Sequence, residues 1–145
     1  MNLLDEIRQA WGWVGIEPEE VVNENEFGNL IVRDAGHQFW RLCPEDVYCE
    51  VIAKTIEQYN SVIKEEDFLE DWFMSAMVEQ AEQTLGKLEP GYKYHMVIPG
   101  VLGGEYGGDN IKIAPLVEII RFSGGLGKKI KDLPPGSEIT LRVVP

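Results

Sequence analysis

The chain has 145 residues, of which 44% are hydrophobic and four are tryptophan, and its formal net charge is −12. This length suits one domain with a substantial core, and the hydrophobic content argues against intrinsic disorder. The acidity disfavours direct binding to nucleic acid or anionic membranes, and no apolar run approaches the roughly 20 residues that span a bilayer.

The acidity is unevenly distributed along the chain. Residues 1–90 contain 20 acidic and 6 basic residues, whereas residues 91–145 contain 5 and 7. We expect one domain over 1–145, with a helical and hairpin part (1–90) and a strand-rich C-terminal unit (91–145), because each part alone is too small for an independent core. The acidic start is unlike a signal peptide and predicts a cytoplasmic protein, with Cys43 and Cys49 as buried, reduced thiols.

The first half of the chain predicts one helix and several short strands. The expected elements are a helix over 3–14, a polar acidic loop over 17–26, a hairpin formed by 28–33 and 38–42, and a short strand or turn near 48–51. Asn2 is expected to cap the helix and Gly15 to end it. In the hairpin turn, Gly36 is the residue expected to take a positive φ.

The second half predicts two helices followed by the strand-rich unit. The helices are expected over 52–63 and 66–86, and the longer one is expected to be the main support of the sheet, with a buried face of Phe68, Leu69, Trp72, Phe73, Ala76, Met77, Ala81 and Leu85. Next come a strand over 92–98, a loop over 99–109, a strand over 111–122 broken near Pro115, a short helix at 126–133 and a last strand over 138–144. The predicted class is α+β, with helices packed on one face of a mainly antiparallel sheet.

The segment Gly100–Asn110 contains five glycines and a group of polar side chains: Glu105, Tyr106, Asp109 and Asn110. These side chains could form a contact surface or the wall of a small-ligand pocket. The competing interpretation is a bulged crossover, in which glycines take positive φ while Asn110 and Glu105 cap backbone groups.

No catalytic or metal-binding pattern is found in the sequence. The run Ser123–Lys129 does not match a phosphate-binding loop, because Phe122 stands where glycine is needed and Lys129 where serine or threonine is needed. His37 and His95 have no partners at metal-ligand spacing. With 25 acidic residues, some carboxylate pair will occur at any separation, so such a pair indicates nothing. We therefore predict no enzymatic activity, no cofactor and no metal site.

Several motifs together resemble one protein family. Pro99, Gly103-Gly104-Glu105-Tyr106, Asn110 and Lys131-Asp132-Leu133-Pro134-Pro135-Gly136 are similar in order and spacing to the C-terminal domain of bacterial type VI secretion immunity proteins. Pro135 departs from the pattern, since many members carry an acidic residue there. The resemblance extends upstream through three further segments: Gly28-Asn29-Leu30-Ile31, Trp40-Arg41-Leu42-Cys43-Pro44-Glu45 and Asp67-Phe68-Leu69-Glu70-Asp71-Trp72.

The resemblance implies a protein that binds a cognate toxin and blocks its active site. Toxins of this system that act in the cytoplasm often attack nucleic acids or nucleotides, so we expect a basic partner and no direct contact with nucleic acid or membrane. The candidate contact residues are Glu66, Glu70, Asp71, Glu105, Tyr106, Asp109 and Asn110. Two alternatives stay open: a small-ligand-binding or enzymatic domain that uses Gly100–Asn110, and an interaction module unrelated to toxins. The oligomeric state is open as well.

Overall fold

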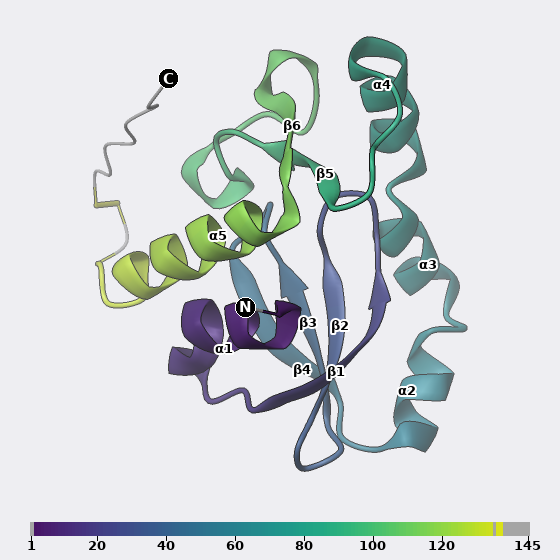
Figure 1. Ribbon diagram of the computed structural model, residues 1–145, viewed down its shortest axis with the longest axis vertical. Coiled ribbons are helices and arrows are strands. Elements are labelled where there is room, and N and C mark those ends of the chain that lie inside the picture. The colour runs from purple at the N-terminus through teal and green to yellow at the C-terminus, as the bar shows by residue number, and fades with distance from the viewer. Residues whose placement is uncertain (1, 135, 138–145) are drawn as a thin grey trace.

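The computed structural model describes residues 2–134 and 136–137 and contains two antiparallel sheets (Figure 1). The larger sheet has the strand order β1-β2-β3-β4, and the smaller pairs β5 with β6. The strands are β1 (Pro18–Glu24), β2 (Leu30–Asp34), β3 (Phe39–Cys43), β4 (Tyr48–Ala53), β5 (Tyr92–Met96) and β6 (Ile111–Pro115). The predicted last strand, 138–144, lies outside the described residues.

The helices are α1 (Leu3–Trp11), α2 (Ile56–Val62), α3 (Glu66–Phe73), α4 (Ser75–Leu85) and α5 (Leu116–Ile130), with 3-10 turns η1 (Gly12–Val14), η2 (Gly100–Leu102) and η3 (Gly108–Asn110). Figure 1 shows α1 and α5 side by side across one face of the larger sheet, with α2 and α3 along its other side. The α+β class and the mainly antiparallel sheet are confirmed, and the helices form layers on both sides.

The alternation of side chains along β2 explains the two helical layers. Leu30 and Val32 face the cluster that contains Trp11 of α1 and Ile120 of α5. Ile31, between them in sequence, points to the opposite face, where Tyr59 of α2 and Trp72 of α3 are buried. A third cluster, built on Phe27, Tyr94, Met96, Ile111 and Ala81, packs the smaller sheet against α4.

The N-terminal helix is confirmed, whereas the loop expected over 17–26 is wrong. Asn2 caps α1 by accepting a hydrogen bond from the Asp5 amide at 2.9 Å, and Gly15, with φ 96°, follows η1. Residues 18–24 form β1 instead of a loop. This strand lies at an edge of the sheet, most of its side chains are exposed, and its pairing with β2 is irregular, so it lacks the apolar alternation that marks a strand.

The hairpin and the strand after it are confirmed, with a correction in the turn. His37, not Gly36, takes the positive φ, at 65°. The next predicted helix begins later than expected, because residues 52 and 53 complete β4 and the hydroxyl of Thr55 caps α2 by accepting from the Gln58 amide.

The long helix expected over 66–86 is interrupted. Met74 adopts a left-handed conformation, with φ 47°, and separates α3 from α4. The expected continuous buried face is therefore wrong: Trp72 and Ala81 are buried, but Phe73 is 59% exposed. The opposite face of the sheet is supported by α1 and α5, which share the cluster containing Leu30 and Leu42.

The strand expected over 111–122 is correct only as far as Pro115, because Leu116 begins α5. The buried residues of α5 recur at helical spacing, and this pattern was not recognised when a strand was predicted. Gly124 and Gly127 lie within this helix because α1 packs closely against it: a Cβ at Gly124 would overlap the Ala10 carbonyl, and one at Gly127 would lie 3.0 Å from the Trp11 ring. Within the described residues, no helix is long and apolar enough to cross a membrane.

Candidate functional site

The three acidic residues predicted as contacts in the helix over 66–86, Glu66, Glu70 and Asp71, all lie on α3 but differ in their bonding. Asp71 accepts a hydrogen bond from Nη1 of Arg41 and forms an ion pair with it. The Arg41 side chain is buried. Glu66 and Glu70 are exposed and have no ion-pair partner among the described residues. Glu66 and Glu70 are thus free to meet a partner, whereas Asp71 fastens α3 to the sheet.

A buried polar network continues inward from Asp71. Arg41 donates from Nε and Nη2 to Oδ1 of Asn29, at 3.1 and 3.0 Å. Asn29, fully buried, donates from Nδ2 to both carboxylate oxygens of Glu45, at 2.9 and 2.8 Å. The Arg41 guanidinium also lies 5.3 Å from the Trp72 ring centroid, within the range of a cation–π contact. The charges are therefore satisfied although they are removed from water.

A second buried amide holds the end of α3. The Asn25 side chain donates to the Trp72 carbonyl at 2.8 Å, and its Oδ1 accepts from the backbone amides of Phe27 and Asn29. The turn between β1 and β2 is thus bonded directly to the last residues of α3. Because the Trp72 carbonyl lies near the end of the helix, the amide satisfies a group that the helix itself leaves unpaired.

The glycine-rich loop is organised by Asn110, as the bulged-crossover interpretation predicted. Its side chain accepts from the Ile98 amide at 2.8 Å and donates to the carbonyls of Ile98 and Glu105 at 2.9 and 2.7 Å. Gly104 is required here, because a Cβ would overlap the Ile98 carbonyl. Asn110 is consequently a scaffold residue. The capping role predicted for Glu105 is wrong, because Glu105 takes part through its backbone carbonyl while its side chain is exposed.

This loop is fastened to the turn between β3 and β4. The Gly100 amide donates to the Glu45 carbonyl at 2.7 Å, and the Tyr106 hydroxyl donates to the Asp46 carboxylate. That hydrogen bond, together with burial, raises the pKa of Tyr106 to about 12. A chain of contacts therefore runs from Asp71 through Arg41, Asn29 and Glu45 to the loop.

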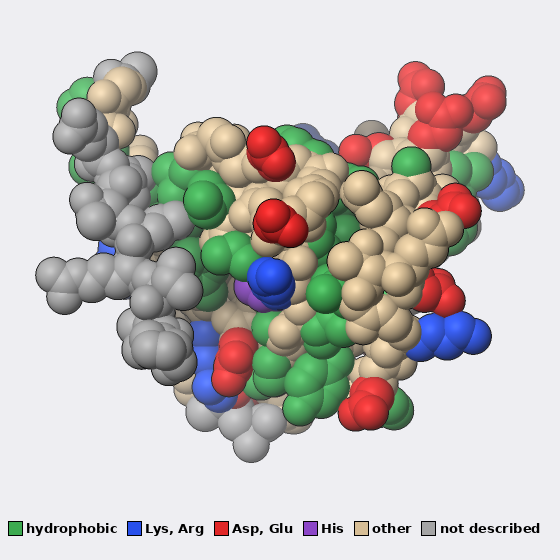
Figure 2. Space-filling view, turned by 90° about the horizontal axis from the view of Figure 1, so that it is seen from above, with side chains coloured by type: hydrophobic (Ala, Val, Ile, Leu, Met, Phe, Trp, Pro, Cys, Tyr) green, Lys and Arg blue, Asp and Glu red, His purple; other side chains and the backbone are tan. Residues whose placement is uncertain are grey.

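Several side chains of the loop still face solvent. Ile98, Val101 and the ring of Tyr106 are each about half exposed, and Glu105 and Asp109 are exposed carboxylates. Figure 2, seen from the end of the molecule at the top of Figure 1, shows hydrophobic side chains across the centre of this surface with only a few charged groups among them. The loop is thus a hydrogen-bonded, partly apolar surface.

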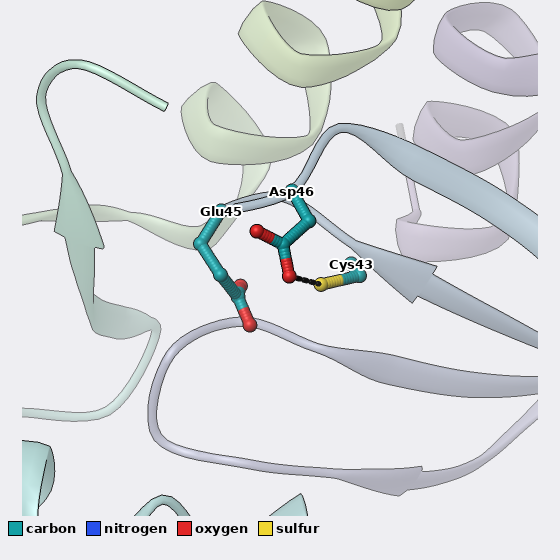
Figure 3. A group of neighbouring side chains, drawn as sticks. All are labelled: Cys43, Glu45 and Asp46. Carbon is teal, nitrogen blue, oxygen red and sulfur yellow. Dashed lines mark hydrogen bonds between the residues drawn. The ribbon is translucent and has the colours of Figure 1, made fainter. Parts of the chain in front are cut away.

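Cys43, Glu45 and Asp46 bring three possible metal ligands within 4.8 Å of one another (Figure 3). Their bonding is unlike that of a metal centre. Both oxygens of Glu45 accept from Asn29, and the Cys43 thiol donates to Asp46. Burial, with the nearby Glu45 charge, raises the pKa of the Cys43 thiol and so opposes the thiolate that a metal requires. The group serves better as the anchor of the loop.

A groove of about 720 Å³ lies beside β5 rather than at the glycine-rich loop. Its walls include Tyr92, Lys93 and the segment 87–91, with carboxylates from β1 and α4. None of the loop residues 100–110 lines this groove. The small-ligand interpretation, which placed a pocket at Gly100–Asn110, therefore gains no support from it.

Comparison with protein families identifies the chain. The model described as "T6SS immunity protein Tdi1, C-terminal" matches residues 53–127, from the end of β4 into α5. The chain belongs to this family of type VI secretion immunity proteins. No curated protein matches it. Family membership gives the immunity protein a cognate toxin as its partner and indicates a non-enzymatic role. The matched segment contains both α3 and the glycine-rich loop.

The supporting residues Asn25, Asn29, Arg41, Glu45 and Asp46 were not predicted as parts of a site. The sequence does contain a signal for most of them, because the upstream segments that resemble the family include Asn29, Arg41 and Glu45. A polar residue within a run of apolar strand residues has to find a partner when the strand is buried. Which partner it finds is set by contacts between residues far apart in sequence.

Proposed function

We propose that this immunity protein binds its cognate toxin directly and occludes the toxin's active site, and that the toxin acts on nucleic acid or nucleotides in the cytoplasm. The observation that carries the proposal is the charge of α3 and α4. Residues 65–85 contain seven carboxylates and no lysine or arginine. Within the described part of the chain, Asp71 is the member of this set that forms an ion pair.

The charge suits a partner that handles phosphate groups. Enzymes acting on nucleic acid carry basic clefts, which an acidic surface complements. Such complementarity raises the association rate and adds specificity, while affinity comes from a few well-packed anchors. The contact residues that we propose are those with free side chains: Glu66 and Glu70 on α3, and Glu105 and Asp109 on the loop. Tyr106 offers its ring, while Asp71 and Asn110 support these surfaces.

The direct test is co-purification of the tagged protein with the product of the adjacent toxin gene, followed by calorimetry. We expect a one-to-one complex with a Kd in the nanomolar range or below. If no complex forms and a nucleotide or sugar instead stabilises the protein saturably in a thermal-shift screen, the small-ligand alternative replaces the proposal.

Charge reversal tests the acidic surface separately from binding as such. In Glu66→Lys/Glu70→Lys, we expect association to slow by about tenfold at low ionic strength, with a weaker dependence on salt. The matched control is Glu89→Lys/Asp132→Lys, which changes the net charge equally at exposed positions away from α3. Equal slowing in both variants, measured by stopped-flow or surface plasmon resonance, would show that total charge matters and the α3 surface does not.

A further inference from the structure

Phe73 is the most exposed of the large hydrophobic side chains described, at 59%. Its neighbour Trp72 is 2% exposed, because α3 turns that side chain onto the sheet. Phe73 is the last residue of α3, and the left-handed Met74 that follows ends the helix there. An exposed aromatic side chain at a defined position is available as an interface anchor when charged groups beside it complement a partner.

The ring has acidic neighbours on its own helical face. Glu70 precedes Phe73 by three residues and Glu66 precedes Glu70 by four, so the three side chains form one row along α3. Both carboxylates are exposed and, within the described residues, form no ion pair. We call Glu66, Glu70 and Phe73 the α3 row. It presents an apolar ring flanked by negative charge.

The α3 row is held rigidly from behind. Asp71 is bonded to Arg41, Trp72 stacks on Phe68 with ring centroids 5.8 Å apart, and the Trp72 carbonyl accepts from Asn25. The Trp72 contacts use the inward side of the helix, and the largely exposed Asp71 carboxylate reaches the buried Arg41 from the helix surface. A partner would therefore meet a surface that needs little ordering on binding, which reduces the entropic cost of association.

We infer that Phe73 is the central hydrophobic anchor for the toxin, inserting into an apolar pocket rimmed by lysine or arginine side chains that meet Glu66 and Glu70. This inference rests on the proposed function. It goes further by placing the contact at the α3 row and by leaving Asp71 out of it. A second copy of this chain is a poor occupant, because two such rows would bring like charges together.

The test measures Kd and dissociation rate for Phe73→Ala against the purified, catalytically inactivated product of the adjacent toxin gene. We expect the Kd to rise at least about 30-fold, mainly through faster dissociation. Truncating a central aromatic anchor removes binding free energy equivalent to at least about that change in Kd. The control is Phe122→Ala on α5, which truncates a ring 48% exposed on the opposite side of the sheet and should change Kd less than about threefold.

Each outcome bears on a different statement. Binding by the wild type with equal effects of Phe73→Ala and Phe122→Ala would overturn the anchor and leave the proposed function intact. No binding by the wild type would overturn the proposed function itself. If the protein alone sediments as a dimer and Phe73→Ala sediments as a monomer, the ring is assigned to self-association instead. If Phe73→Ala melts well below wild type, Phe73→Gln, a polar side chain suited to an exposed helix, takes its place in the same assay.

Discussion

Arg41 and Glu45 are the two buried charged residues that hold the proposed surfaces in place, and Asn29 joins them. Its amide accepts from the guanidinium and donates to the carboxylate, so one neutral side chain satisfies two charges. A sequence cannot reveal this arrangement easily, because Arg41 and Glu45 lie 12 and 16 residues from Asn29 and meet it only when β2 pairs with β3. The exposed Glu66 and Glu70 were proposed as contact residues from their charge alone, and that role stays a prediction.

At this scale we predict that Asn29→Ala lowers the free energy of unfolding by about 3 kcal/mol, because Glu45 loses both hydrogen bonds from Asn29 and Arg41 loses the acceptor of its Nε and Nη2 groups. Urea denaturation followed by tryptophan fluorescence measures the change. The control is Asn23→Ala, at an exposed position in β1, where the effect should stay within about 0.5 kcal/mol. Similar effects of the two substitutions would show that the network contributes little to stability.

At the scale of elements, the sequence predicted best where local signals were strong. α1 has a capping asparagine and helical spacing, and the hairpin has two apolar runs around a polar turn. β1 was missed because an edge strand with acidic side chains carries no alternation. α5 was misjudged because its glycines and Pro115 suggest breaks, although the proline precedes the first turn and two glycines make room for α1.

Adjacent glycines in α5 provide a test of that explanation. A Cβ at Gly124 would overlap the Ala10 carbonyl of α1, whereas one at Gly125 would meet nothing within 4 Å. We predict that Gly124→Ala lowers the free energy of unfolding by about 2 kcal/mol or more, because the helices must move apart. Gly125→Ala should raise it by up to about 1 kcal/mol through helix propensity. Thermal and urea unfolding measure both, and an equal gain in both variants would contradict the close packing of α1 and α5.

At the scale of the whole molecule, the first and last described helices are joined by an ion pair. Arg121 of α5 donates from Nε to the Glu6 carboxylate of α1 at 2.8 Å, although the residues are 115 positions apart. The hydrogen bond and charge of Arg121 hold the pKa of Glu6 below its ordinary value of 4.5. The stabilisation is therefore fully present above about pH 4.5 and is lost as the pH falls through the lower pKa of the folded state.

We predict that Glu6→Gln lowers the free energy of unfolding near pH 7 and that its difference from wild type shrinks as the pH falls below about 4.5. Urea unfolding across pH 3.5 to 7 measures this difference. Glu45, whose pKa burial raises, contributes the opposite dependence, but it is present in both proteins and its effect cancels in the comparison. A difference that is constant across the range would show that the ion pair does not respond to protonation of Glu6.

The division of α3 into two sides has a consequence for how such proteins change over generations. Its inward side chains, including Phe68 and Trp72, hold the helix, while Glu66, Glu70 and Phe73 touch mainly solvent. Substitutions at exposed positions usually alter stability by less than about 0.5 kcal/mol. A lineage can therefore exchange the outward residues to follow a diverging toxin while the fold is preserved, and an engineer can retarget the protein at the same positions.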